Sequence, residues 1–178
     1  MVAEDRPAGF FVTTHSCYAA ICDEGSLASR PGFMDAEWAA AGRAAREAGQ
    51  EDYWRLFHFN DRLMRLAEQG ELLAWALLFD GVFRAVVDTA PHTPSQPSPS
   101  NLGAQRLGAR LLCPTGRLVL TCMTALGTRQ RPFVEVDPGA YEVVVLRDDD
   151  QELRHGLIEL ADYAAGDGPD WRIAIRPA

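Results

Sequence analysis

At residues 72–87 the chain reads LLAWALLFDGVFRAVV, two apolar runs separated by Asp80-Gly81. Leucine-, valine- and phenylalanine-rich runs of this length favour strands, and Asp-Gly accepts the positive φ angles that a tight hairpin turn requires. The stretch therefore predicts two antiparallel strands joined by a short turn. It also marks the point at which the pattern of the chain changes from helix to strand.

Two amphipathic helices are predicted before this point. Residues 34–48 are rich in alanine and end before Gly49, and residues 51–69 repeat leucine and phenylalanine at spacings of three and four and end before Gly70. Such spacing places apolar side chains on one helical face, and glycine is favoured just after a helix ends. We expect the helices to form an insertion at about residues 34–69.

Strands are predicted on both sides of this insertion. Residues 10–22, FFVTTHSCYAAIC, are rich in aromatic and β-branched residues and predict one strand before the helices. At the end of the chain, residues 171–176 alternate Trp171, Ile173 and Ile175 with polar or small residues. This alternation predicts a half-buried strand with the apolar side chains facing the core.

Two more hairpins are predicted after the helices. Residues 106–113 and 117–126 flank Pro114-Thr115-Gly116, and residues 132–136 and 141–146 flank Asp137-Pro138-Gly139-Ala140. Proline and glycine at these places favour tight turns. Both faces of the 117–126 strand are largely apolar, which predicts a central position in its sheet.

Together these elements predict one mainly β domain spanning residues 1–178. About seven to nine strands are expected, and the helices come early instead of alternating with strands, which excludes a doubly wound α/β sheet. An antiparallel β-sandwich with an early two-helix insertion fits best, with an α+β half-barrel as the alternative. Residues 91–101, rich in proline and serine, predict a flexible loop.

The charge of the chain restricts the classes of partner. The net charge is −8 over 178 residues, and all 17 basic residues are arginine, which excludes Schiff-base and P-loop lysine chemistry. An acidic protein repels nucleic acid and anionic lipid, so we expect neither nucleic acid nor a membrane as a partner. With no secretory signal at the start and no apolar run of roughly 20 residues, we expect a cytoplasmic protein.

Acidic residues are concentrated in the last third of the chain. Residues 135–170 contain eleven acids against Arg147 and Arg154, whereas residues 91–134 contain five arginines and no acid. Calcium binding is disfavoured because the EF-hand spacing is absent. We expect the acidic residues to bind a basic partner, through Asp148, Asp149, Asp150, Glu152, Glu159, Asp162, Asp167 and Asp170.

No motif predicts a catalytic centre, a metal site or a cofactor. His15 and Cys17 lie two positions apart in a predicted strand, share a face, and could act as base and nucleophile, so a small enzyme using this pair is an alternative. The other cysteines lack the spacing of zinc ligands. We expect Cys17, Cys22, Cys113 and Cys122 to be reduced, buried thiols.

Two stretches resemble small bacterial β-sandwich proteins that include the competence-system nuclease inhibitor. One joins GRLVL at residues 116–120 to VEVDPGAYEV at residues 134–143, a strand after glycine followed by a Pro-Gly-x-Tyr turn. The other, residues 70–84, is similar to small bacterial proteins that are suspected immunity factors. The resemblance implies a protein that binds and neutralises a toxin or nuclease, and it transfers no catalytic residue.

The sequence therefore favours an immunity-type inhibitor that occludes the active site of a cognate bacterial toxin, such as a nuclease. A structural or assembly subunit is a further alternative. Its contact surface would be the aromatic residues at Tyr53, Trp54 and Phe57.

Overall fold

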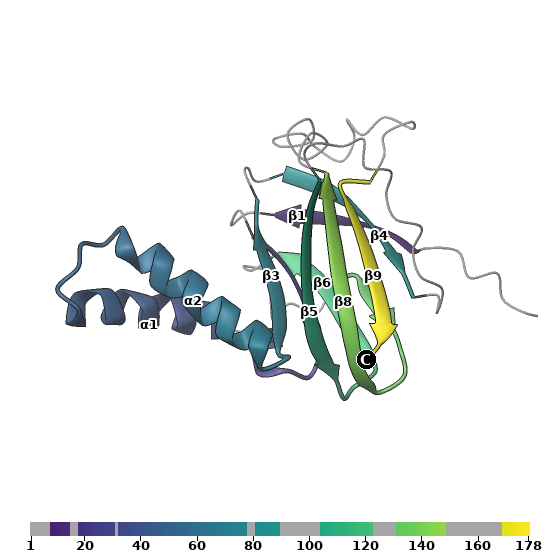
Figure 1. Cartoon of the computed structure of the whole chain (residues 1–178), viewed down its shortest axis with the longest axis horizontal. Coiled ribbons are helices and arrows are strands. Elements are labelled where there is room, and N and C mark those ends of the chain that lie inside the picture. Colours follow the sequence, from purple (N-terminus) through teal and green to yellow (C-terminus); the bar gives the residue numbers. More distant parts are fainter. Residues whose placement is uncertain are drawn as a thin grey trace, which may run out of the picture.

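The computed structural model describes residues 8–14, 18–30, 32–77, 81–89, 104–122, 131–148 and 169–178. Within these ranges the chain forms nine strands, one short 3-10 helix and two α-helices (Figure 1). In chain order the elements are β1 (Ala8–Thr14), β2 (Tyr18–Asp23), η1 (Leu27–Ser29), α1 (Phe33–Glu47), α2 (Trp54–Glu68), β3 (Leu72–Ala76), β4 (Gly81–Asp88), β5 (Ala104–Cys113), β6 (Arg117–Cys122), β7 (Phe133–Glu135), β8 (Gly139–Asp148) and β9 (Trp171–Pro177).

The strands form two sheets that share one core. The five-stranded sheet has the order β1-β4-β9-β8-β5, and the four-stranded sheet has the order β3-β2-β6-β7. The mainly β class, the early helices and the central position of β6 are confirmed. The strictly antiparallel arrangement is wrong at one place, because β4 and β9 run parallel. A parallel pair needs a long connection, and most of the second half of the chain lies between these two strands.

All three predicted hairpins are wrong, because each turn joins strands of different sheets. β3 pairs with β2, whereas β4 pairs with β1 and β9. In the same way β5 pairs with β8 while β6 pairs with β2 and β7. A turn sequence fixes where the chain reverses, but burial of both apolar faces decides which strand becomes the hydrogen-bonded neighbour.

The prediction of a single strand over residues 10–22 is also wrong, because this stretch contributes to two strands, β1 and β2. β1 pairs with β4 in the five-stranded sheet, and β2 pairs with β3 and β6 in the other. Residues 15–17, which separate them in sequence, and the predicted loop 91–101 lie outside the described residues.

Aromatic residues from both sheets meet in the centre of the core. The Trp171 side chain of β9 is fully buried, as the alternation of its strand predicts. Its ring stacks on Phe83 of β4 at a centroid distance of 5.2 Å and meets Trp75 of β3 edge to face, also at 5.2 Å. Because Trp75 belongs to the opposite sheet, these contacts join the two layers.

The helices α1 and α2 form an antiparallel pair, here called the helical arm, that projects away from the sheets (Figure 1). Its base covers the outer face of the four-stranded sheet, where Phe59 and Leu63 of α2 pack with Ala20 and Leu72. The Tyr18 hydroxyl of β2 also donates a 2.9 Å hydrogen bond to Oδ1 of Asn60. The arm is thus fixed to the sandwich at its base.

Within the arm the two helices are joined by aromatic and ionic contacts. Trp38 of α1 meets Phe59 edge to face at 5.1 Å, and the guanidinium of Arg55 lies 4.3 Å from the centre of the Trp38 ring. Arg62 of α2 pairs with Glu37 of α1. These contacts leave the opposite face of α2 uncovered by α1.

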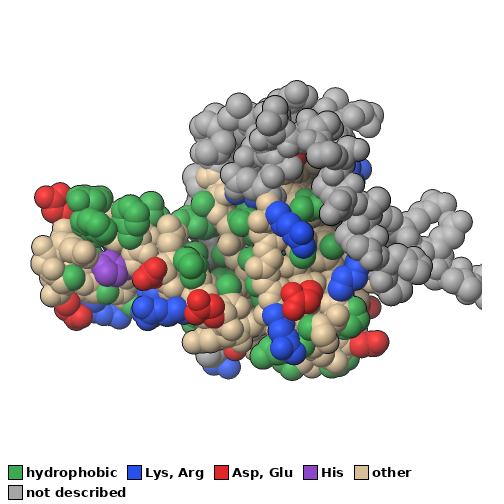
Figure 2. Space-filling view, in the orientation of Figure 1, with side chains coloured by type: hydrophobic (Ala, Val, Ile, Leu, Met, Phe, Trp, Pro, Cys, Tyr) green, Lys and Arg blue, Asp and Glu red, His purple; other side chains and the backbone are tan. Residues whose placement is uncertain are grey.

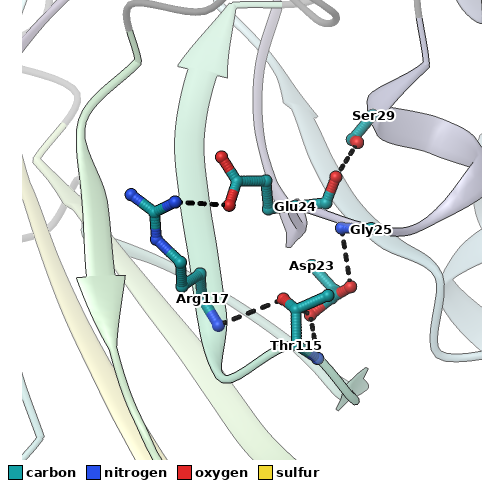
Figure 3. Close-up of polar contacts among 6 residues, drawn as sticks. All are labelled: Asp23, Glu24, Gly25, Ser29, Thr115 and Arg117. Carbon is teal, nitrogen blue, oxygen red and sulfur yellow. Dashed lines mark hydrogen bonds and ion pairs between the residues drawn. The ribbon is translucent and has the colours of Figure 1, made fainter.

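A buried aspartate, Asp23, fixes the end of the sandwich from which the helices depart (Figure 3). Its carboxylate accepts hydrogen bonds from the Gly25 N–H at 2.8 Å, the Thr115 N–H at 3.1 Å and the Thr115 hydroxyl at 2.5 Å. A Cβ at Gly25 would lie 2.6 Å from Cγ2 of Thr115, so this contact requires glycine. Asp23 therefore ties the end of β2 to the β5–β6 turn.

Candidate binding site

One face of α2 carries large apolar side chains that no described residue covers. Tyr53 is 60% exposed, Phe57 58% and Met64 62%. Their spacing of four and seven residues places them along one side of the helix. We call these three residues the α2 stripe. Figure 2 shows hydrophobic side chains along this edge of the arm and again where the arm meets the sheets.

The distal half of the α2 stripe is a connected aromatic cluster. The rings of Tyr53 and Trp54 lie 5.5 Å apart, and those of Trp54 and Phe57 lie 5.1 Å apart. Aromatic side chains held by their neighbours lose little conformational entropy on binding, and they are enriched at the centres of protein interfaces. The sequence prediction of an exposed aromatic surface is confirmed at Tyr53 and Phe57, while Trp54 is partly buried.

The proximal end of the α2 stripe leads into a groove of about 750 Å³ between α2 and the edges of the two sheets. Leu63, Leu73 and Trp75 are buried in its floor, and Met64 stands at its rim. The groove is lined by Tyr18, Asn60, Leu63, Met64, Ala67, Glu68, Leu73, Ala74, Trp75, Ala76, Leu107, Gly108, Ala109, Arg110 and Arg147. Met64 connects the α2 stripe to the groove, and the polar side chain of Asn60 lies between Phe57 and Met64 on the same side of the helix.

A second cavity, of about 700 Å³, lies at the end of the sandwich near the C-terminus and is more polar. Its main cation, Arg117, already pairs with Glu24 at 2.7 Å and stacks on the Phe133 ring with Cζ 3.9 Å from the ring centre. The Tyr141 hydroxyl donates to the backbone carbonyl of Asp137. The Arg117 contacts join β6 to β7 and to the end of β2 within the four-stranded sheet, and the Tyr141 contact joins β8 to the β7–β8 loop, so we assign this cavity a structural role.

Only two of the predicted acidic partner-binding residues lie in the described part of the chain. Asp148 is partly buried at the end of β8. Asp170 is fully buried, and its carboxylate accepts a 2.7 Å hydrogen bond from the Arg84 N–H. The prediction that Asp170 contacts a partner is therefore wrong, because this side chain joins β9 to β4. Residues 149–168, which contain Asp149, Asp150, Glu152, Glu159, Asp162 and Asp167, lie outside the described residues.

The thiols of the described residues are buried. Cys22, Cys113 and Cys122 are buried thiols that form no disulfide, which is the state predicted for them. Burial raises the pKa of Cys22 to about 12, and burial together with the Asp23 carboxylate raises the pKa of Cys113 to about 12. Both are thus protonated at neutral pH and are poor nucleophiles.

The histidines offer no assembled catalytic group in the described ranges. Nε2 of His58 lies 2.7 Å from Oε1 of Gln50, a contact within the helical arm. His15 and Cys17 lie outside the described residues, so the enzyme alternative stays a prediction. Among the residues the structure describes, no three His, Cys, Asp or Glu side chains are placed to hold a metal ion. No described helix is long and apolar enough to span a membrane.

No protein-family description and no curated protein sequence matches the chain. Among solved structures, the protein described as Crocagin biosynthetic gene J matches with a TM-score of 0.68 and 21% identity, over 97% of each chain. The two chains share this fold. The structure of ComJ, inhibitor of the DNA-degrading activity of NucA from Bacillus subtilis, matches with a TM-score of 0.45 and 7% identity, over 97% of this chain and 96% of that one.

ComJ is a nuclease inhibitor, the class of protein that the turn motifs resemble. A TM-score below 0.5 does not establish a common fold, so this match adds nothing to the site described above. One structural neighbour is thus an inhibitor of a nuclease and the other is a biosynthetic gene product.

The sequence indicated the aromatic half of this site and missed the rest. Met64 and the groove were missed because the groove is made by α2, β3 and β5, which are far apart in sequence. The available signal was the breadth of the apolar arc on α2. Phe59 and Leu63 already supply a buried face, so Tyr53, Phe57 and Met64 exceed what packing against one layer requires.

Proposed function

We propose that this chain is a non-catalytic binding protein whose partner protein docks on the α2 stripe and the adjoining groove. The observation that carries the proposal is the exposure of Tyr53, Phe57 and Met64 on one side of a helix that is held rigidly at its base. Burying three such side chains would contribute several kcal/mol to association.

We further propose that the partner is a basic bacterial toxin, such as a nuclease, and that binding neutralises it by occluding its active site. The acidic residues Asp148 to Asp167 would pair with basic groups of the toxin or take the place of phosphates. Charge of this kind mainly accelerates association, whereas apolar contacts set the lifetime of the complex. Asp170 is left out of this role because it is buried.

The test measures binding and inhibition with the same purified partner. Any basic toxin encoded by a gene next to this one is titrated with the protein, and complex formation and toxin activity are followed together. Phe57→Ser should weaken binding at least tenfold and restore toxin activity to the same extent. Phe133→Ser is the matched control, because Phe133 is also a partly exposed phenylalanine but lies on β7, at the far edge of the four-stranded sheet. Equal effects of the two substitutions would reject docking on α2.

Charge steering is tested in the same system. Replacing Asp148, Asp149, Asp150 and Glu152 with asparagine and glutamine should slow association roughly tenfold at low salt and change dissociation less. The effect should shrink as ionic strength rises, because the Debye length falls to about 8 Å at physiological salt. Unchanged rate constants with a verified partner would show that these acids are only a solvated surface.

An assembly subunit is the second candidate function. The fold is shared with a protein described as a biosynthetic gene product, and the α2 stripe would serve equally to recruit a biosynthetic enzyme. The two candidates differ in the outcome of binding. An inhibitor abolishes the activity of its bound partner, whereas a recruiting subunit leaves that activity unchanged or raises it.

A further inference from the structure

The outer edge of β5 carries backbone hydrogen-bonding groups that pair with no described strand. β5 is the last strand of its sheet, and the described strand that pairs with it is β8. The Leu112 N–H donates to the Gly70 carbonyl at 2.8 Å and thus points away from β8. Because backbone groups alternate in direction along a strand, the N–H and C=O of Gly108 point to this same open edge. At the Arg110 end a Cβ on Gly70 would lie 3.1 Å from the Arg110 carbonyl oxygen, so this carbonyl is covered. The open template for one more strand is the stretch from Arg106 to the Arg110 N–H.

This edge borders the groove at the base of the arm. Gly108 and Arg110 line the groove, together with the half-buried side chains of Leu107 and Ala109. On the opposite side the groove is lined by Leu63 and Met64 of α2. A strand added to β5 would direct every second side chain between β5 and α2, into apolar surroundings.

The other side of the same edge is basic. Arg106 and Arg110 are exposed and lie four residues apart on the face of β5 that points away from the core, and Arg110 also reaches the rim of the groove. Neither forms an ion pair within the described residues. On β8, the register places Leu146 beside Arg106 and Glu142 beside Arg110. An added strand would bring its remaining side chains directly opposite these two arginines.

These charges argue against a second copy of this chain as the added strand. Antiparallel pairing of two β5 edges about Gly108 would place Arg106 of one copy opposite Arg110 of the other. Like charges directly opposite each other destabilise a strand pair. The same positions favour a segment that presents carboxylates.

We propose that the edge of β5 from Arg106 to Arg110 binds, by strand addition, an extended segment of the partner protein in which apolar residues alternate with acidic ones. The apolar side chains would enter the groove and the acidic ones would pair with Arg106 and Arg110. This proposal rests on the proposed function in that a partner protein exists, and it names the part of the partner that the groove accepts. The backbone ladder supplies affinity and the alternation supplies specificity.

The probe for this edge is a labelled peptide in which valine alternates with glutamate. Binding is measured by fluorescence anisotropy against two controls, a peptide of the same composition with valines and glutamates in separate blocks, and a peptide in which lysine replaces glutamate. The alternating glutamate peptide should bind at least tenfold more tightly than either control. Equal affinity for the block peptide would overturn strand addition.

Gly108→Pro tests the backbone contribution. Proline removes an N–H that points to the open edge and leaves the bonds from β5 to β8 in place. We expect affinity for the peptide to fall about tenfold, while Gly108→Ala, whose Cβ would make only ordinary contacts, retains it. Hydrogen exchange gives a second readout: the bound peptide should protect the amides of Gly108 and Arg110 and leave those of Leu107 and Ala109, which already face β8, unchanged. Protection without this alternation would contradict the proposal.

The charge pattern is tested on the exposed arginines, where substitution does not disturb the core. Arg106→Glu with Arg110→Glu should reverse the preference, so that the lysine peptide binds more tightly than the glutamate peptide. An unchanged preference would overturn the assignment of these arginines.

Failure of this proposal and failure of the proposed function are distinguishable. If Gly108→Pro leaves partner binding intact while Phe57→Ser abolishes it, strand addition is wrong and docking on α2 stands. If Phe57→Ser has no effect on partner binding while Gly108→Pro abolishes it, strand addition stands and the α2 stripe is not the docking surface.

Discussion

The core between the two sheets and the outer face of α2 both contain clusters of aromatic side chains, but the two clusters differ in solvent exposure. Trp171 is fully enclosed by Phe83 and Trp75 and contributes to the free energy of folding. Tyr53 and Phe57 are more than half exposed, although they too contact an aromatic neighbour. Because the exposed part of an apolar side chain adds little to the free energy of folding, the exposed surface of Tyr53 and Phe57 is left for contact with another molecule.

The substitution expected to change the free energy of unfolding most is at Trp171, in the core. Trp171→Ala should lower the free energy of unfolding by about 3–5 kcal/mol, because it removes a fully buried indole and leaves a cavity between the sheets. Urea unfolding followed by circular dichroism gives the value. A loss below about 1 kcal/mol would show that the two sheets are not held together by this cluster.

A smaller effect is expected at Asp23. Asp23→Ala should cost about 2–3 kcal/mol of unfolding free energy, because the N–H groups of Gly25 and Thr115 lose their acceptor. Asp23→Asn keeps one acceptor oxygen and should cost less. If the asparagine and alanine variants are equally stable, the carboxylate does not join β2 to the β5–β6 turn as described.

The pH dependence of stability reports on the buried thiols. The pKa of Cys22 is raised from 9.0 to about 12 by burial, so the folded protein binds a proton that the unfolded chain loses above pH 9. This stabilising effect is complete well below pH 9 and is lost as pH rises from about 9 toward 12, so that about 1.4 kcal/mol of the unfolding free energy is lost by pH 10. Urea unfolding of wild type and Cys22→Ala at pH 8 and pH 10 tests this. Between pH 8 and pH 10 the free energy of unfolding should fall less for Cys22→Ala than for wild type. An equal fall in both proteins would contradict a raised pKa of Cys22.

The smallest effect on folding is expected on the α2 stripe. Phe57→Ser should change the free energy of unfolding by less than about 0.5 kcal/mol, because the side chain is 58% exposed and is not part of either core cluster. The same substitution is expected to have a large effect on partner binding. A destabilisation comparable to that of Trp171→Ala would instead show that Phe57 is a core residue, and the contrast between the two regions would disappear.

Comparing the predicted and observed helices and strands shows which structural features local sequence patterns can predict. The helical spacing and the glycines at 49 and 70 predicted both helices to within about three residues, and both glycines have positive φ. The alternation in β9 predicted which of its side chains are buried. By contrast, Asp80-Gly81 predicted a hairpin between strands that lie in separate sheets. Local patterns report dihedral angles and burial, but they do not report which strand becomes the neighbour.

The acidic residues show the same limit of sequence patterns, because local sequence did not predict that Asp170 is buried. Asp170 was grouped with its acidic neighbours because charge can be counted along a sequence, yet it accepts a hydrogen bond from the Arg84 backbone and is buried. That role depends on β9 lying beside β4, which only long-range pairing creates.

The sequence by itself determined the mainly β class, the two early helices, the burial pattern of β9 and the aromatic residues at positions 53 and 57. Each of these follows from neighbours a few positions apart, through backbone propensity and the periodicity of apolar residues. The tertiary structure alone decided the pairing of strands, the burial of Asp170, and the groove in which α2, β3 and the open edge of β5 meet. These depend on contacts between residues far apart in the chain, where the best burial of all apolar faces at once selects one arrangement from many that are locally equivalent.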